Sequence, residues 1–381
     1  MKKIAILGIT GSIGKSAVEV VREQKKHFKI QIATAHNNVK ELLSLAAEFK
    51  IPHLVITNAN AQKQNLEIPK ASKLYFGESE LQNLLQNEEY DIALNAISGS
   101  AGLIPSYNIL KCEKDLALAN KESLVMAGHI LTKMQTKNKI LPVDSEHSAL
   151  FQVLHGEGKK NIRNLILTAS GGSFRDTPLP ALKNVSLKET LDHPNWDMGA
   201  KVTIDSATMF NKALEVTEAH WLFDINYEDI EVVLHPQSII HSMVKFIDGS
   251  ILAQMSQPSM KLPILYALSF PDRYSSHLVE TDLSQLAELT FRKITKQRYP
   301  LFFHTVELCR HGGLLPTIIN SINEAAITLF LQNKIQFLDI SKLIINITDQ
   351  FPNKAEPNLE EIINTNKEVF DFTIRNFTKF I

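Results

Sequence analysis

The stretch Ile4-Ala5-Ile6-Leu7-Gly8-Ile9-Thr10-Gly11-Ser12-Ile13-Gly14 decides the fold of the first part of this chain. Its first four residues are apolar and predict a buried strand, and a helical pattern follows from Ser16. Gly8 permits a tight turn, Gly11 lets the backbone approach a ligand, and Gly14 lets the helix pack on the strand. Because a helix N-terminus offers unpaired N–H groups and a positive dipole end, the stretch suits a pyrophosphate. The alternative is a glycine-rich turn without a ligand, since the spacing is GxxGxxG and not the commoner GxGxxG.

The alternation of apolar strands with helical patterns continues to about residue 145. It predicts an α/β domain of the Rossmann type, with a doubly wound parallel sheet covered by helices on both faces. The expected strands are residues 4–7, 30–34, 54–56, 92–96, 116–119 and 140–143. The expected helices include residues 16–23, 39–49 and 103–111.

The pattern changes after residue 145 and predicts a central α+β domain followed by a C-terminal helical bundle. In the central part we expect strands at 165–168, 231–234, 238–246 and 249–255, and a helix at 205–223 with Asp205 or Ser206 as its N-cap. Residues 258–290 are richer in Pro and Ser and are expected to form a connection. Helical periodicity returns at 317–332, 338–347 and 359–377. The expected domains are therefore a nucleotide-binding domain at 1–145, a central α+β domain at 146–266 and a C-terminal helical domain at 291–381. Residues 267–290 are expected to link the last two.

The composition excludes several classes of protein. The chain has 381 residues, 44% of them hydrophobic and 21% charged, with a formal net charge of -1, so it lacks the one-signed charge that nucleic acid or an anionic membrane requires. Cys112 and Cys309 lie far apart and cannot form a disulfide framework, which is typical of a reducing compartment. The apolar start is broken at Gly8, and no stretch is long and apolar enough to cross a bilayer. We expect a soluble cytoplasmic protein without a targeting segment.

The end of the second expected strand bears on the choice of cofactor. A site for NAD usually has Asp or Glu there, bonded to the ribose 2′-hydroxyl. This chain has Ala35-His36-Asn37-Asn38 instead. A 2′-phosphate would not be repelled, and His36 and the two amides could donate to it. The sequence therefore favours NADP.

Two acidic residues follow the last strand of the first domain, in Val143-Asp144-Ser145-Glu146-His147. In an extended segment, Asp144 and Glu146 would share a face. Two adjacent carboxylates repel unless a cation or proton joins them, so the pair suits Mg²⁺ or Mn²⁺. The alternative, which the spacing alone favours, is an N-cap pair at a helix start.

The expected helix at 205–223 places three polar side chains on one face. Asn211, Lys212 and Glu215 are spaced i, i+1 and i+4, with Lys212 and Glu215 three apart, so they converge. Glu215 could complete a metal site while Lys212 and Asn211 bind a phosphate. The alternative is an exposed Lys–Glu pair that contributes little.

Two loops also have the composition of ligand-binding segments. In His193-Pro194-Asn195-Trp196-Asp197-Met198-Gly199 a tryptophan lies among turn residues, which suggests a lid that closes over a ligand. A Trp196 packed in a local core is the alternative. Ser170-Gly171-Gly172-Ser173 follows a strand and could donate hydroxyl and N–H groups to a phosphate, although a plain turn would look the same.

Together these segments resemble the 1-deoxy-D-xylulose 5-phosphate reductoisomerase family. The resemblance spans the chain and rests on long, low-probability strings in a fixed order. They are residues 8–14, 118–125, 141–147, 193–196 and 205–209, then Asn211-Lys212, Glu215, and residues 235–238 and 241–244. The chain departs from the family at His36 and Asn37, where a Gly and a basic or small residue are usual, at Ser173, where Pro is usual, and at Asp197, where Ser is commoner.

The resemblance implies a homodimer that uses NADPH and Mg²⁺ or Mn²⁺, with Co²⁺ as a further option. The reaction it implies is the rearrangement and reduction of 1-deoxy-D-xylulose 5-phosphate to 2-C-methyl-D-erythritol 4-phosphate, on a route to isoprenoids. The implied cofactor contacts are Thr10, Gly11, Ser12, Ile13, Asn38, Asn120, Glu122 and Gly199, to which the residue patterns add Gly8, Gly14, His36 and Asn37. The implied metal ligands are Asp144, Glu146 and Glu215. The implied substrate and lid contacts are Lys121, Ser145, Glu146, Ser170, His193, Trp196, Ser206, Asn211, Lys212 and Glu215, of which Lys121, Glu146 and His193 are the catalytic candidates.

Three other functions compete with this one. The first is an NADP-dependent dehydrogenase of another polyol phosphate, without rearrangement. The second is a metal-dependent sugar-phosphate lyase or aldolase, which would give the glycine loop no purpose. The third is a non-catalytic nucleotide sensor, which would not need three carboxylates.

Overall fold

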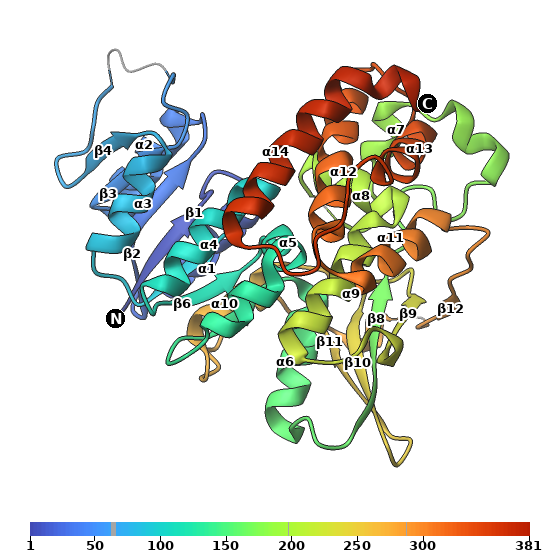
Figure 1. The fold of residues 1–381 in the computed structure, drawn as a ribbon. Helices are drawn as coiled ribbons and strands as arrows, with labels where there is room; N and C mark the ends of the chain where they lie inside the picture. Colours follow the sequence, from blue (N-terminus) through green and yellow to red (C-terminus); the bar gives the residue numbers. More distant parts are fainter. Residues whose placement is uncertain (62–65, 197, 287) are drawn as a thin grey trace. The chain divides into compact units, whose positions relative to one another are not determined.

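The computed structural model describes residues 1–61, 66–196, 198–286 and 288–381 (Figure 1). These residues divide into two compact units. The first unit contains Met1–Asn120, Leu131–Ser148 and Ser259–Glu280. The second contains Lys121–Ile130, Ala149–Pro258 and Thr281–Ile381.

A parallel sheet forms the centre of the first unit, which confirms the predicted doubly wound domain. Its order in the described part of the chain is β4-β3-β2-β1-β5-β6-β7, and all its paired strands run parallel. The strands are β1 (Lys2–Leu7), β2 (Phe28–Ala35), β3 (His53–Ile56), β4 (Lys73–Phe76), β5 (Ile92–Asn95), β6 (Asp115–Leu118) and β7 (Ile140–Pro142). The order changes direction between β1 and β5, and open α/β sheets bind ligands outside the carboxyl ends of strands at such a switch point. Residue Gly8 follows β1 directly at this point.

The helices of the first unit cover the sheet (Figure 1). They are α1 (Ser12–Glu23), α2 (Val39–Phe49), α3 (Glu78–Asn87), α4 (Leu103–Lys111) and α10 (Lys261–Ser269). The sequence patterns predict neither β4 nor α3. Strand β4 lies at the edge of the sheet and is only partly buried, and its short apolar run, Leu74-Tyr75-Phe76, does not by itself identify a strand.

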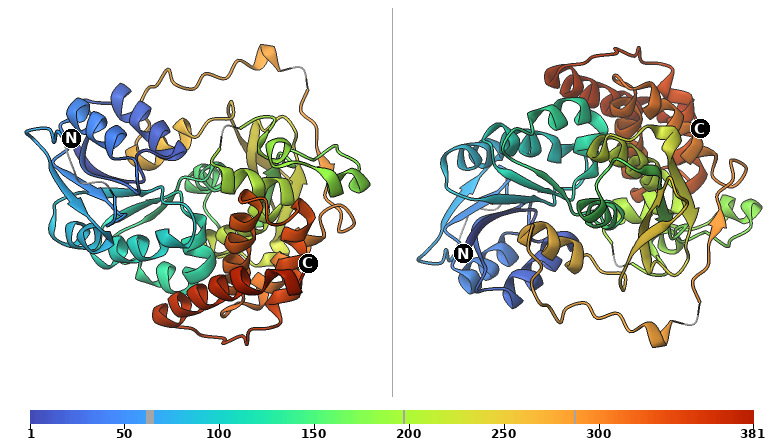
Figure 2. Two further views of the ribbon diagram at one scale, coloured as in Figure 1. Left: turned by 90° about the horizontal axis from the view of Figure 1, so that it is seen from above. Right: turned by 90° about the horizontal axis from the view of Figure 1, so that it is seen from below.

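Helix α10 corrects the prediction that residues 258–290 form a connection. The helix is buried from Pro263 to Ser269 and packs on α1; Figure 2 shows the two helices side by side in both views. The Nζ atom of Lys261 lies 2.5 Å from Glu19 Oε2, and Lys2 Nζ donates to Leu268 O at 2.8 Å. Pro263 is compatible with this helix because a proline in the first turn removes no intrahelical hydrogen bond. The expected linker at 267–290 therefore begins inside a helix.

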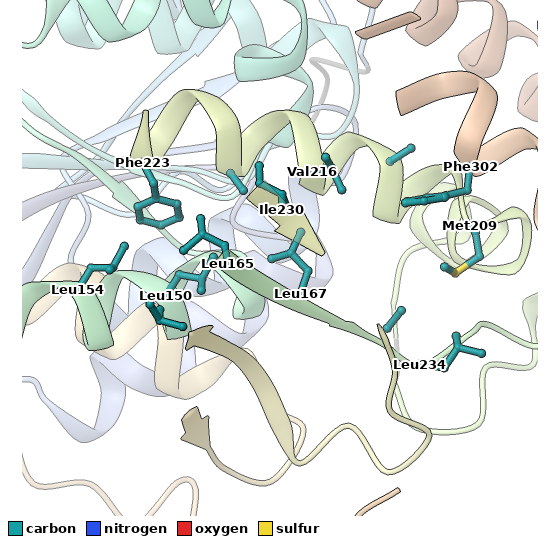
Figure 3. Close-up of a cluster of buried hydrophobic side chains, with 14 of the residues drawn as sticks. Leu150, Leu154, Leu165, Leu167, Met209, Val216, Phe223, Ile230, Leu234 and Phe302 are labelled. Carbon is teal, nitrogen blue, oxygen red and sulfur yellow. The ribbon is translucent and has the colours of Figure 1, made fainter. Parts of the chain in front are cut away.

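A mixed sheet forms the centre of the second unit. Its order within the described residues is β11-β10-β8-β9-β12, in which β8 and β9 are parallel and the other pairs antiparallel. The strands are β8 (Ile162–Ala169), β9 (Ile230–Leu234), β10 (Ile240–Phe246), β11 (Ile251–Met255) and β12 (Arg292–Lys293). Figure 3 shows Leu165 and Leu167 of β8 facing Val216 and Phe223 of the helix α9 (Phe210–Phe223). This core holds α9 firmly on the sheet.

The remaining helices surround this sheet or belong to the C-terminal part of the chain. They are α7 (Leu187–Leu191), α8 (Ala200–Thr208), α11 (Pro300–His311), α12 (Leu315–Leu331), α13 (Phe337–Thr348) and α14 (Leu359–Asn376). Two more, α5 (Lys121–Leu131) and α6 (Ser145–Glu157), begin after β6 and β7. The helix α12 is buried along most of its length and packs against α13 and α14, which confirms the predicted C-terminal helices, while α11 was not predicted. Among the described residues no helix combines the length and apolarity of a membrane span.

The helix predicted at 205–223 is in fact two helices. Met209 has a left-handed backbone (φ 61°) and separates α8 from α9. Gly199 takes the N-cap position of α8, so Asp205 and Ser206 lie inside a helix and cap nothing. Hydrophobic periodicity continues across the break, and for this reason the sequence pattern did not reveal it.

Candidate active site

The glycine loop after β1 has the geometry of a phosphate cradle. Gly8 has φ +82°, and a Cβ atom on it would lie 2.8 Å from Ala96 O. A Cβ on Gly14 would lie 2.3 Å from Gly8 O, so a side chain at this position would displace backbone. The helix α1 begins at Ser12, earlier than predicted, and Gly11 at its N-cap has no side chain to occupy the first-turn N–H groups. These groups fit the pyrophosphate of a dinucleotide.

The residues after β2 form an exposed polar group. His36 Nδ1 lies 2.9 Å from Thr57 Oγ1, and Asn37 Oδ1 accepts from Asn58 Nδ2 at 2.7 Å. Asn38 caps α2. No carboxylate stands at the three positions that follow β2, which agrees with the expectation of NADP.

A carboxylate does occur in the first turn of α2. Glu41 Oε2 accepts from Asn38 Nδ2 at 2.5 Å, and Glu41 Oε1 lies 3.5 Å from Lys15 Nζ. The charge of Glu41 is thus paired with an ammonium group. Its repulsion of a 2′-phosphate is reduced accordingly.

The acidic segment after β7 has the backbone of a helix start, the alternative that its spacing alone favoured. The helix α6 begins at Ser145, and the amide of Ser145 donates to Asp144 Oδ1 at 3.1 Å. Asp144 and Glu146 therefore do not share a face of an extended segment; the alternative of a helix start is correct for the backbone. The hydroxyl of Ser145 donates to the Glu146 carboxylate. Carboxylate oxygens at the positive end of a helix suit a hard divalent cation. Asp144 and Glu146 therefore fit the role of metal ligands that the resemblance implies for them.

The face of α9 confirms the predicted convergence. Asn211 Nδ2 and Lys212 Nζ both donate to the carboxylate of Glu215. The Nζ atom of Lys121, on the first turn of α5, donates to Asn211 Oδ1 at 2.8 Å and lies 3.3 Å from Glu215 Oε1. The side chains of Lys212 and Glu215 are only 5% and 2% exposed, so the alternative of an exposed Lys–Glu pair is wrong. Two ammonium groups thus meet a buried carboxylate, an arrangement typical of a binding site for an anion or a metal.

The loop Ser170-Gly171-Gly172 lies against the backbone of α8. Gly171 and Gly172 have φ of +86° and +70°. A Cβ on Gly172 would lie 2.5 Å from Ser206 O, so the loop approaches Ser206 more closely than any other residue type permits. The loop that bears Ser170 thus lies beside Ser206, and the resemblance assigns both serines to one phosphate.

His193 connects this loop to the predicted lid. Its Nδ1 accepts from the N–H groups of Asn195 (3.2 Å) and Trp196 (3.0 Å). The proton of the neutral ring is therefore on Nε2, which donates to Ser170 Oγ at 3.0 Å. Burial, with a smaller effect of the Arg175 charge, lowers the pKa of His193 to about 4. The ring is neutral at neutral pH, and the hydroxyl proton of Ser170 can be donated elsewhere.

Trp196 lies between α7 and α8 and is partly buried. Its ring meets that of His241 edge-on, with 6.1 Å between the centroids. Asp197 lies outside the described residues. Among the described residues, nothing lies within 4 Å of the position that a Cβ on Gly199 would take. A partly buried indole on a loop fits both the lid hypothesis and the alternative of a local core.

Asn120 and Glu122, two expected cofactor contacts, have different partners. Asn120 Nδ2 donates to Ile97 O and Gly99 O, both at 2.8 Å, and so holds the loop that follows β5. The Glu122 carboxylate accepts from Lys201 Nζ at 2.7 Å. The sequence analysis missed Lys201. Its spacing of four residues from Asp205 was the available signal, but spacing does not reveal burial.

Comparison with known proteins identifies the family. Family profiles match residues 4–128 as 1-deoxy-D-xylulose 5-phosphate reductoisomerase, and residues 140–223 and 255–371 as C-terminal domains of that enzyme. A 1-deoxy-D-xylulose 5-phosphate reductoisomerase of Clostridium tetani is 43% identical over 378 residues, with 98% of each chain covered. The chain belongs to the 1-deoxy-D-xylulose 5-phosphate reductoisomerase family. Another reductoisomerase, from Bacillus anthracis, is 43% identical over 371 residues, with 96% of each chain covered.

Solved structures of the reductoisomerase family have the same fold. One, in complex with NADPH, fosmidomycin and magnesium, has a TM-score of 0.89 and 35% identity, with 99% of this chain and 98% of that chain covered. The Zymomonas mobilis reductoisomerase in complex with NADPH has a TM-score of 0.89 and 34% identity, with 99% of each chain covered. The family and the fold predicted from the sequence are both confirmed.

Proposed function

We infer that this chain converts 1-deoxy-D-xylulose 5-phosphate to 2-C-methyl-D-erythritol 4-phosphate with NADPH and a divalent metal, on a route to isoprenoid precursors. The observation that carries this inference is the full-length match to the reductoisomerase family at 43% identity. The glycine loop after β1 and the cluster of Lys121, Asn211, Lys212 and Glu215 support it independently. Within the chain, we propose that residues 1–145 bind the cofactor, that 146–266 carry the chemistry, and that 291–381 form the helical part.

The glycine loop is the proposed pyrophosphate site. Thr10, Gly11, Ser12 and Ile13 precede or open α1, where first-turn N–H groups point out of the helix. When bound, NADPH supplies the hydride that reduces the rearranged aldehyde. Asn120 supports this site by fixing the loop after β5.

Asp144, Glu146 and Glu215 are the proposed metal ligands. A divalent cation there would polarise the substrate carbonyl and stabilise developing negative charge. The hydroxyl of Ser145 donates to Glu146 and so restricts that carboxylate. Lys121 lies 3.3 Å from Glu215 Oε1 and can donate to a substrate oxygen beside it.

The substrate phosphate is proposed to bind Ser170, Ser206, Asn211 and Lys212. The close approach of Gly172 to Ser206 supports a joint site for the two serines. The Nε2–H of His193 occupies a lone pair of Ser170 Oγ, which leaves the Ser170 hydroxyl as a donor. Closure of the segment that bears His193 and Trp196 would exclude water, which would otherwise protonate an enediolate.

The nature of the product separates this function from its closest rival. A simple dehydrogenase would reduce the ketone to CH₃–CHOH, whose methyl protons are split into a doublet. The rearranged product carries its methyl group on a carbon without hydrogen, which gives a singlet. We expect a methyl singlet in the proton NMR spectrum of the product, and a doublet would refute the rearrangement.

We also propose that the protein forms a homodimer and is located in the cytoplasm. In the described part of the second sheet, β11 is an outer strand, with Ile251 49% and Leu252 40% exposed. An exposed apolar edge strand tends to be covered by another chain, and a second copy would cover it here. The cysteines are unpaired, which suits a reducing cytoplasm. A light-scattering mass of twice 42.8 kDa is expected, and a mass of 42.8 kDa would refute the dimer.

The cofactor preference can be measured directly. We expect kcat/KM to be about tenfold or more higher with NADPH than with NADH, because polar donors rather than an acid follow β2. His36 and Asn37 replace the usual residues, so the ratio is expected to be smaller than in a relative that has the basic residue. Steady-state rates with both cofactors decide the matter. Equal kcat/KM values would contradict the preference.

The lid hypothesis predicts that Trp196 enters a drier environment when ligand binds. The chain has only two tryptophans, and the other, Trp221, packs its ring against Gly128. In a Trp221→Phe variant the emission therefore comes from Trp196, and it should shift on addition of NADPH, metal and a phosphonate analogue of the substrate. Trp196→Ala should lower kcat/KM and leave NADPH affinity intact. An unchanged spectrum together with full activity of Trp196→Ala would place Trp196 in a local core.

A further inference from the structure

A buried polar network joins three helices of the second unit at Lys201. The Lys201 Nζ atom donates to Glu122 Oε1 at 2.7 Å and to Asp205 Oδ2 at 2.8 Å. Asn323 Nδ2 donates to Asp205 Oδ1 at 2.7 Å. Glu122 lies in the first turn of α5, Lys201 and Asp205 on α8, and Asn323 on α12. The side chains of Glu122, Lys201 and Asp205 are 7%, 17% and 2% exposed.

The charges of this network depend on Lys201. Burial opposes ionisation of Glu122, but the charge and hydrogen bond of Lys201, together with smaller effects of a backbone N–H and of Lys121, outweigh burial and lower the pKa of Glu122. Burial raises the pKa of Asp205 more than Lys201 and Asn323 lower it. For Lys201 itself, burial favours the neutral form, but Asp205, Glu122 and Glu324 outweigh burial and raise the pKa. The bond between Lys201 and Glu122 is therefore an ion pair at neutral pH, and it connects α8 with α5.

The two carboxylates of the network are chain neighbours of expected site residues. Glu122 follows Lys121, whose ammonium group reaches Asn211 and Glu215, and Asp205 precedes Ser206. The helical geometry of α5 is broken at Ala127 (φ -134°), so Lys121 and Glu122 lie on the short helical segment that precedes the break. The hydrogen bond from Lys201 to Glu122 therefore restrains the position of the neighbouring residue, Lys121.

Stability alone does not account for such a network. Two charges removed from water lose hydration, and replacement of a buried ion pair by apolar side chains is often neutral or stabilising. A lysine held between carboxylates gives instead a fixed distance and direction between two helices. Functional sites need this precision, because a misplacement of about 1 Å can cost about a hundredfold in rate.

We propose that Lys201 is a positioning residue of the reductoisomerase site, which fixes the first turn of α5 to α8 and thereby aligns the Lys121 ammonium and the Glu122 carboxylate. The proposal rests on the proposed function, because Lys121 and Glu122 are expected to contact substrate and cofactor. Lys201 acts on the site through Glu122, to which it donates.

The test compares two variants that each remove one charge from the network. Lys201→Met breaks the bond between α5 and α8, whereas Asp205→Asn leaves the Lys201–Glu122 pair in place. We expect Lys201→Met to lower kcat by about tenfold to a hundredfold and to raise the Kd for NADPH, measured by nucleotide fluorescence. Asp205→Asn should keep most of the kcat and the NADPH affinity. The Tm is expected to fall in both variants. Lys201→Arg, which keeps the positive charge and can still donate to both Glu122 and Asp205, should recover most of the kcat.

Lys342→Met is the matched control, since Lys342 pairs with Asp339 at 2.8 Å on α13 but is 53% exposed; it should change no readout. A wild-type kcat and Kd in Lys201→Met would overturn the proposal. A fall of kcat in proportion to Tm in both Lys201→Met and Asp205→Asn would overturn it too, because that result indicates a structural role. If Lys201→Met does not fold, Lys201→Gln, which keeps one amide donor, is read against the same outcomes. If the wild-type enzyme does not turn over the ketose phosphate, the proposed function is refuted, and not the role of Lys201. The Kd for NADPH would then still be compared between the wild type, Lys201→Met and Asp205→Asn.

Discussion

Glu146→Gln is expected to lower kcat by at least about a hundredfold, because it removes one charge from the proposed carboxylate ligands of the metal. Glutamine keeps the size of the side chain, so the start of α6 and the hydrogen bond from Ser145 should be perturbed little. The glycine loop lies after a different strand, and NADPH affinity should stay close to that of the wild type. The measurements are kcat at saturating Mg²⁺ or Mn²⁺ and a fluorescence titration with NADPH.

Glu157→Gln provides the control, since it makes the same change in an exposed residue at the other end of α6. It should leave kcat and the metal requirement unaltered. Raising the metal concentration should restore part of the activity of Glu146→Gln. Near-normal turnover of Glu146→Gln at ordinary metal concentration would remove Glu146 from the metal site.

Lys212→Ala is expected to raise KM for the ketose phosphate by about tenfold to a hundredfold, the value of a charge-assisted hydrogen bond. Lys212 is buried on the face of α9 that also bears Asn211 and Glu215, so its ammonium group is held toward the site rather than toward solvent. KM for NADPH should change little. Steady-state kinetics with each substrate varied separately give both constants.

Lys367→Ala, in an exposed position on α14, controls for the loss of a lysine on a helix. An unchanged KM for the ketose phosphate in Lys212→Ala would mean that Lys212 serves only as a partner of Glu215. In that case the phosphate would have to be bound by Ser170, Ser206 and Asn211.

The parts of the fold that could be predicted are those with a strong local pattern. The inner strands of the first sheet are continuous apolar runs, and each was found within a few residues of its place. Strand β4 was missed because its short apolar run, Leu74-Tyr75-Phe76, does not by itself separate a strand from other structure, and α10 because Pro263 and the neighbouring serines resemble a connection. The break at Met209 depends on a left-handed backbone at a residue type that rarely adopts it, and no local pattern reveals it.

The candidate site shows the same division between local and distant information. Helical spacing predicted that Asn211, Lys212 and Glu215 converge, and they do. Lys121 joins them from 90 residues away, which spacing cannot show; only the resemblance pointed to it. The backbone after Asp144 is a helix start, the alternative that the spacing alone favoured, because the acidic residues that suit a metal also suit a helix start.

The most direct test of the account is consumption of NADPH by the metal-stripped enzyme with 1-deoxy-D-xylulose 5-phosphate. We predict no consumption until Mg²⁺ or Mn²⁺ is added, and steady turnover afterwards that depends on both the metal and the ketose phosphate. Turnover that continues without a divalent metal, or the absence of NADPH consumption with either metal, would contradict it.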